Sequence, residues 1–362
     1  MKLQLSWKSA LTRKHVKRDI YMKVRKILAG AVMFLALTSS VFAAKAKKLK
    51  VVTTIFPEYD WVREIVGENN KNVDLTLLVS NGVDLHSYQP SIQDIAKIST
   101  ADIFIYVGGE SDAWVKDALA NATNKNMKVI NLMEVLEGQT KTEEVKEGMQ
   151  VSEHHHHHDE DEEEDHDHDH EAEGHHHHLH DGEAQYDEHV WLSVRFAKTL
   201  CAVISKALCD VDSANSSSYK ANLKAYTEKL DNLDAKFSTA VKNGNKKTLL
   251  FGDRFPFRYF VEDYKLDYYA AFVGCSAETE ASFETVAFLA KKVDELGLNS
   301  VIKIESGDGK IARTIVENSK KKNAKVLTLD SIQSTTLKQA KAGASYLKIM
   351  EENLKVIEEA LK

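Results

Sequence analysis

The sequence predicts an α/β protein with two parallel-sheet lobes that a single long, rigid helix joins. Short apolar, β-branched segments alternate with segments of helical periodicity in two blocks, residues 49–132 and 248–361. Continuous apolar strands between helices are typical of a parallel sheet that helices cover on both faces. Between the blocks, residues 213–241 contain neither Gly nor Pro and place apolar side chains at helical spacing. One helix of about 42 Å would connect the lobes, and it would allow only small closing motions of one lobe toward the other.

The first block predicts an N-terminal lobe over residues 45–212. Helical periodicity predicts its last helix, from Asp187 to about Leu208. The expected strands are 49–55, 73–79, 103–107 and 129–132, and the other helices begin at Pro57, Ser91 and Trp114.

The second block predicts a C-terminal lobe over residues 244–362, after a linking helix over 213–243. Its last helix should run from about Leu337 to Leu361. The expected strands are 248–251, 266–272, 301–304 and 326–329, and the earlier helices are 256–263, 282–296 and 310–319.

The first 44 residues have the composition of a signal peptide. Basic residues between Lys2 and Lys26 precede an apolar run over 27–37, and Ala43-Ala44 end a segment of small residues suited to cleavage. We therefore expect export and a periplasmic or extracytoplasmic location. An uncleaved membrane anchor is the alternative. The lipid-anchored form is disfavoured because no Cys follows the apolar run.

A tract rich in His, Asp and Glu interrupts the first lobe. Residues 153–188 hold thirteen histidines before His189 and sixteen acidic side chains, with no Lys or Arg. Neutral imidazole binds zinc, copper and nickel, so this composition predicts a disordered insert over residues 137–186 that collects metal weakly at many sites. A solvated acidic spacer would have the same composition. An expression tag is disfavoured because the tract is internal and acid side chains interrupt it.

The charge distribution excludes a nucleic-acid partner. The chain has a net charge of -7, and without residues 1–44 it holds 39 basic against 54 acidic side chains. Sixteen of those acids belong to the tract, so the rest of the protein is close to neutral and offers no basic face.

Three cysteines allow at most one disulfide. Cys201 and Cys209 fall in one predicted helix and are about 12 Å apart along its axis, which is too far for a bridge. A disulfide would therefore involve Cys275, and we predict free thiols instead. The spacing of the cysteines is not that of a zinc site.

Two histidines lie where parallel-sheet proteins place their ligands. His86 follows a predicted strand and precedes a helix, and His189 lies in the first turn of a helix that Asp187 can cap. A single His in a loop is more often structural than ligating. The His-rich tract directly before His189 favours ligation here.

These residues resemble the metal-binding subunits of ABC importers for zinc and manganese, and most closely the zinc-uptake periplasmic binding proteins. The segment Asp84–Pro90 (Asp-Leu-His-Ser-Tyr-Gln-Pro), with Ala-Asp-Ile-Phe at 101–104, is similar to the family's first-histidine segment. Asp187–Leu192 (Asp-Glu-His-Val-Trp-Leu) is similar to its second. The resemblance covers residues 49–361, and it implies two α/β lobes with metal bound in the cleft between them.

The resemblance implies four metal ligands. The third departs from the family pattern, whereas Asp330 resembles the carboxylate ligand that other members bring from the second lobe. Zinc-specific members carry a third histidine where this chain has Arg254, which cannot donate an electron pair to a metal. We predict His86, His189, Asp253 and Asp330 as ligands. Asp253 could instead cap the chain or pair with Arg254, and Asp330 could cap a strand end. The fallback carboxylates are Glu305, Glu278 and Glu280.

Two histidines and two carboxylates suit Zn²⁺ and also Mn²⁺. The tract favours Zn²⁺, because Mn²⁺ binds imidazole weakly. We therefore expect an extracytoplasmic, monomeric zinc-binding protein that delivers metal to the membrane permease of an ABC transporter. The alternatives are a manganese-specific importer subunit, a metal-buffering or adhesion protein, and a secreted metallohydrolase. A catalytic zinc keeps an open position for water, and the chain has no H-E-x-x-H motif, so we predict that the protein is not an enzyme.

Overall fold

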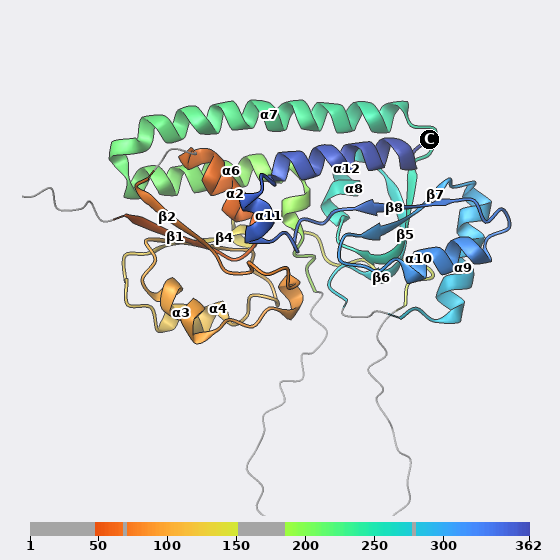
Figure 1. Cartoon of the computed structure of the whole chain (residues 1–362), viewed down its shortest axis with the longest axis horizontal. Coiled ribbons are helices and arrows are strands. Elements are labelled where there is room, and N and C mark those ends of the chain that lie inside the picture. Colours follow the sequence, from red (N-terminus) through yellow and green to blue (C-terminus); the bar gives the residue numbers. More distant parts are fainter. Residues whose placement is uncertain (1–47, 68–70, 151–184, 277–279) are drawn as a thin grey trace, which may run out of the picture. The chain divides into compact units, whose positions relative to one another are not determined.

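The computed structural model describes residues 48–67, 71–150, 185–276 and 280–362 and shows two α/β lobes (Figure 1). Within these residues, each lobe holds one four-stranded sheet whose strands are all parallel. The first sheet has the order β2-β1-β3-β4 and the second has the equivalent order β6-β5-β7-β8. The strands are β1 (Leu49–Thr53), β2 (Val73–Leu77), β3 (Ile103–Tyr106), β4 (Lys128–Asn131), β5 (Thr248–Phe255), β6 (Asp267–Val273), β7 (Ser300–Ile304) and β8 (Lys325–Leu329). This arrangement confirms the predicted fold class.

Helices cover both sheets. The first lobe contains α2 (Phe56–Val66), α3 (Ile92–Ser99), α4 (Val115–Ala120), α5 (Leu132–Val135) and α6 (Val194–Val211), with 3₁₀ turns η1 (Leu85–Ser87), η2 (Val190–Leu192) and η3 (Ser213–Asn215). The second contains α8 (Arg258–Tyr264), α9 (Phe283–Leu296), α10 (Lys310–Asn318), α11 (Leu337–Lys341) and α12 (Tyr346–Ala360). None of the described helices is long and apolar enough to cross a membrane.

Helix α7 (Ser216–Asn243) joins the lobes and packs on helices of both. It contacts α2 and α6 of the first lobe and α8 and α12 of the second (Figure 1). Tyr219, Tyr226, Leu230 and Phe237 recur at helical spacing and are almost completely buried. Burial of one apolar stripe along the helix is what stabilises a 28-residue helix whose other face is in water. The helix is therefore a fixed part of one core that extends through both lobes.

A second connection was not predicted from the sequence. After β8 the chain returns to the first lobe, where the Leu337 N–H donates to the Ser80 carbonyl and the Tyr346 N–H donates to Asp60. The predicted helix 337–361 is also two helices, α11 and α12. Gly343 between them has φ +98°, a conformation that favours glycine, and the Ser345 side chain then caps α12.

Two local differences from the sequence prediction affect the site. Strand β5 continues to Phe255 instead of ending at Phe251, with a register shift between Phe251 and Arg254. Asp253 and Arg254 therefore lie in a strand rather than in a loop. The helix expected from Asp187 begins at Val194, and the residues before it form η2.

The insert predicted for 137–186 is described at its two ends alone. Thr142 forms an isolated antiparallel bridge with Tyr186, and the Gln150 N–H donates to Ala271 O in the second lobe. Residues 151–184, which include all thirteen histidines of the tract, lie outside the described residues. So does the predicted signal peptide.

Candidate metal centre between the lobes

His86 is positioned by the turn that follows β2. Asp84 caps η1, where its Oδ1 atom accepts a hydrogen bond of 3.0 Å from the His86 N–H. On the far side of the ring, His86 Nδ1 lies 2.7 Å from Ser111 Oγ and 3.6 Å from Glu188 Oε2. With Nδ1 occupied in this way, the Nε2 atom of His86 faces His189.

His189 is fixed by the carboxylate two residues before it. Asp187 Oδ1 accepts from both the His189 N–H at 2.8 Å and His189 Nδ1 at 2.9 Å. A carboxylate can only accept when ionised, so Nδ1 carries the proton and Nε2 keeps its lone pair for a metal. The Trp191 ring packs 5.1 Å from the imidazole between ring centroids, and His189 is completely buried.

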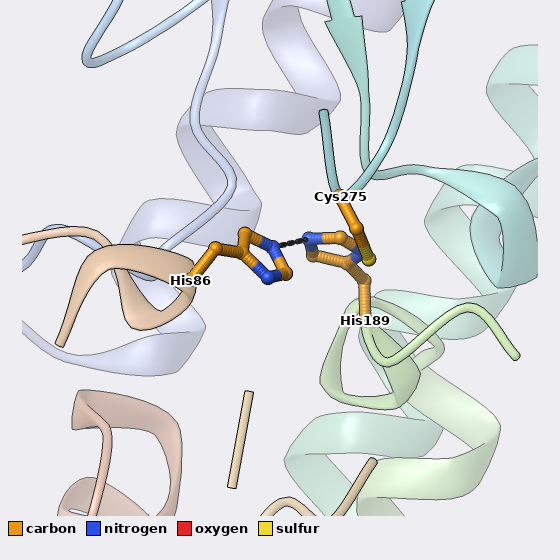
Figure 2. Close-up of side chains that lie close together, drawn as sticks. All are labelled: His86, His189 and Cys275. Atoms are coloured by element: carbon orange, nitrogen blue, oxygen red, sulfur yellow. Dashed lines mark hydrogen bonds between the residues drawn. The ribbon is translucent and has the colours of Figure 1, made fainter. Parts of the chain in front are cut away.

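The two imidazoles meet at their Nε2 atoms, which are 3.1 Å apart (Figure 2). Two nitrogens bound to one tetrahedral zinc at about 2.0–2.1 Å each would be about 3.3 Å apart. The rings are thus held at nearly the separation that a shared metal ion requires. His86 comes from the β2–α3 connection and His189 from the turn before η2, so the pair forms through tertiary structure alone.

The surroundings of the two rings differ in charge. Burial and the neighbouring His189 lower the pKa of His86 to about 3, so its ring is neutral. Burial acts against charge on His189 as well, but the adjacent Asp187 carboxylate outweighs it and raises the pKa of His189 above its usual value.

Cys275 is the third side chain of the group (Figure 2). The ligand atoms of His86, His189 and Cys275 all lie within 4.8 Å of one another, and no other group of this kind occurs in the described part of the chain. Burial and the nearby Glu143 raise the pKa of the Cys275 thiol, so it is neutral without metal.

The sequence analysis missed Cys275, although one signal was available. Cys275 follows the carboxyl end of β6, and the ends of parallel strands are where ligands collect. Gly274 is required beside it, because a Cβ atom there would lie 2.9 Å from Phe255 O and 3.2 Å from His189 Cε1. The spacing of the three cysteines did not reveal this group, because it combines one cysteine with two histidines.

Arg254 connects the two halves of the site. Its Nη2 atom donates to Asp84 Oδ2, on the turn that holds His86, and its Nη1 atom donates to Ser276 O at 3.2 Å, beside Cys275. Both members of the Arg254–Asp84 ion pair are mostly buried, with side chains 14% and 16% exposed. Arg254 cannot bind a metal, but it holds both segments that could.

Asp253 and Asp330 lie outside this group and stay predictions as ligands. Both oxygens of Asp253 accept from the backbone: Oδ1 from the Arg254 N–H at 2.9 Å and Oδ2 from the Ile304 N–H at 3.1 Å. These contacts are the ones expected if Asp253 caps backbone N–H groups instead of binding a metal. Asp330 Oδ1 accepts from the Ile332 N–H at 2.7 Å, and burial and Glu305 raise the pKa of Asp330 to about 7.

The fallback carboxylates differ in their surroundings. Glu305 accepts hydrogen bonds from the Ser331 N–H, the Ser331 hydroxyl and the Ser334 hydroxyl. Glu280 is exposed, and Glu278 lies outside the described residues. Neither Glu305 nor Glu280 belongs to the group around the two histidines.

Residues 51–360 match the model of the ZnuA family, described as the zinc-uptake complex component A, periplasmic. The chain belongs to this family. Zinc-binding protein AdcA of Streptococcus pyogenes serotype M3 is 29% identical over 313 residues, which cover 86% of this chain and 55% of AdcA. High-affinity zinc uptake system protein ZnuA of Bacillus subtilis is 28% identical over 321 residues, which cover 88% and 89% of the two chains. This chain therefore spans about half the length of AdcA.

The solved structures give the same family and fold. The Zn(II)-bound ZnuA-like domain of Streptococcus pneumoniae AdcA is 25% identical, with a TM-score of 0.63, and the match covers 87% of this chain and 99% of that domain. This chain and that domain thus share the two-lobe fold.

Proposed function

We propose that the protein captures Zn²⁺ in the cleft between its lobes and delivers it as cargo to the membrane permease of an ABC importer. Membership of a periplasmic zinc-uptake family and the zinc-binding relatives support this role. His86 and His189 are the proposed ligands from the first lobe, and Asp330 is the proposed carboxylate from the second. The protein would act outside the cytoplasm as a monomer, without nucleic acid.

The observation that carries the proposal is the approach of the two buried imidazoles. Their Nε2 atoms are 3.1 Å apart, and partners on each Nδ1 atom hold both rings in place. Two neutral imidazole nitrogens at this distance need a proton or a metal ion between them, and a metal ion would bind to both. Oriented imidazoles with hydrogen-bonded Nδ1 atoms are typical of metal ligands.

The same geometry favours carriage over catalysis. A hydrolytic zinc needs an open position for water and a general base within reach. The site instead lies between lobes that two chain connections hold together, with His189 completely buried. Transport requires that the ion be enclosed and later released, which suits a cleft.

We propose that the tract over residues 153–188 gathers zinc for the cleft. Its imidazoles bind metal when neutral, so they should release zinc as the pH falls through about 6.5. The end of the tract lies close to Cys275. Tyr186 is bridged to Thr142, one residue before Glu143, which contacts Cys275.

The test is a competitive titration with Zn²⁺ and Mn²⁺ of a protein in which a flexible linker replaces residues 151–184. Gln185 stays, because its carbonyl accepts from the Glu143 N–H. We expect one tight zinc site, which His86→Ala removes. Loss of all tight binding on deleting the tract would indicate a metal buffer. Tighter binding of Mn²⁺ than of Zn²⁺ would support the carrier role but show that the transported metal is manganese.

A further inference from the structure

We infer that Cys275 is the third protein ligand of the bound metal and the residue that makes the site select Zn²⁺ over Mn²⁺. This inference rests on the proposed zinc carriage and names the chemistry of its site. Arg254 contacts both halves of the site but cannot donate an electron pair to a metal, so a third donor must come from another residue near the two histidines.

The geometry leaves little movement for Cys275 to make. Zinc bonds of about 2.3 Å to sulfur and 2.0–2.1 Å to nitrogen place tetrahedral S and N ligands about 3.6 Å apart. One ring nitrogen of each histidine and the Cys275 sulfur already lie within 4.8 Å of one another. A side-chain adjustment that brings the sulfur toward the two Nε2 atoms completes three corners of a tetrahedron. The fourth corner is left to Asp330, the carboxylate proposed above.

The segment that carries Cys275 is held in place on both sides. Arg254 donates to Ser276 O, and the Cys275 N–H donates to Glu143 Oε1 at 2.8 Å. Gly274 allows the backbone to approach His189 to within van der Waals contact. Arg254 thus acts as a positioning residue: it binds no metal itself, and it holds the segment that carries Cys275.

Asp253 is a weaker candidate for the third ligand on the same evidence. Its two oxygens accept hydrogen bonds from the backbone N–H groups of Arg254 and Ile304, and among the described residues it lies outside the group formed by the two histidines. Cys275 belongs to that group. Metal binding replaces the S–H bond by an S–metal bond, and the thiol proton is released to the solvent.

The ligand set determines the metal. A thiolate is a soft ligand that Zn²⁺ binds well, whereas Mn²⁺ prefers carboxylate and water oxygens. Two imidazoles with a thiolate therefore favour Zn²⁺ more strongly than two imidazoles with a carboxylate would.

The experiment is a Co²⁺ titration of the full chain followed by absorption spectroscopy. Cobalt bound to a thiolate gives a sulfur-to-metal charge-transfer band in the near ultraviolet, and histidine-bound cobalt in the tract does not contribute to it. We expect the band in the native protein and in Cys209→Ser, and its loss in Cys275→Ser. Added Zn²⁺ should abolish the band by displacing cobalt.

Two further measurements give the size of the effect. Cys275→Ser should weaken zinc binding by at least the roughly 10–100-fold that loss of an outer-shell partner costs. Cys275→Asp should lower the ratio of zinc to manganese affinity, whereas Cys209→Asp should not. In the native protein, Zn²⁺ should protect Cys275 from iodoacetamide and leave labelling of Cys209 unchanged, which tests the inference without any variant.

The outcomes separate this inference from the proposed function. A tight zinc site that depends on His86, without a charge-transfer band and without protection of Cys275, would overturn the role of Cys275 and leave zinc carriage intact. Absence of any tight site dependent on His86 would overturn the carrier role itself. A band that survives in Cys275→Ser would place the sulfur ligand at another cysteine and contradict the inference.

Discussion

The two histidines of the site differ in the atom that holds each Nδ1. Asp187 gives His189 an ionised carboxylate at 2.9 Å, whereas Ser111 gives His86 a hydroxyl at 2.7 Å. The carboxylate raises the pKa of His189 and makes its Nε2 atom the more basic donor. As a proposed ligand, His189 therefore has the stronger of the two donor atoms.

Asp187→Asn should weaken zinc binding by about 10–100-fold, the usual cost of losing a charged outer-shell partner. The amide oxygen of Asn can still accept from His189 Nδ1, so the ring should stay in place and the thermal stability should change little. Competition against a chelator of known affinity measures the effect. Asp231→Asn, which removes an exposed partner of Lys198, is the matched control. Equal zinc affinity in the two variants would show that Asp187 does not tune His189.

At the scale of elements, the return of the chain after β8 is what fixes the lobes to each other. Arg63 of α2 donates to Ala340 O at 3.2 Å and to Ala344 O at 2.8 Å, on either side of the α11–α12 break. The same guanidinium pairs with Asp60, which is completely buried. One cation therefore satisfies a buried carboxylate and two helix-end carbonyls of the returning segment.

Arg63→Met should lower the free energy of unfolding by about 3 kcal/mol, because it leaves Asp60 buried without its cation. The side chain of Met keeps most of the packing volume, so the loss reports the charge and the hydrogen bonds. Urea denaturation of the metal-free protein gives the value. Asp60→Asn in the same background should recover part of the loss. If Arg63→Met alone is as stable as the native protein, Arg63 does not hold the returning segment.

At the scale of the whole molecule, several carboxyls are buried with raised pKa values. Burial raises the pKa of Asp60 to about 6 against the effect of Arg63, and burial together with Glu188 raises the pKa of Asp112 to about 7. A carboxyl with a higher pKa in the folded state binds its proton more tightly there. The stability that this proton contributes is present at low pH and is lost as the pH rises through the folded-state pKa.

The metal-free protein should therefore melt at a lower temperature at about pH 8 than at about pH 5. Asp112→Asn should reduce this difference by up to roughly 3 kcal/mol in free energy, because the two pH units between pH 5 and a folded-state pKa of about 7 are worth about 1.4 kcal/mol each. Calorimetry with a chelator present measures it, and the exposed Asp117→Asn serves as control. A melting temperature that rises over this interval in the native protein would contradict the prediction.

The element pattern could be predicted because strands and helices depend on local periodicity. All eight predicted strands occur within a few residues of their expected positions, and α7 follows from the absence of Gly and Pro. The errors lie where tertiary contacts override local pattern. Gly343 breaks a helix whose two parts pack on different neighbours, and the register shift in β5 moves Asp253 into a strand.

By itself, the sequence determined the two-lobe α/β fold, the family and the two loops that bear His86 and His189, because each depends on residues close together in the chain. The tertiary structure decided which side chains share the cleft. Cys275 lies 86 positions after His189 and carries no spacing pattern, and its approach to the two histidines depends on how two sheets pack along α7. Ligand sets assembled from separate strand ends follow from that packing, which local periodicity does not encode.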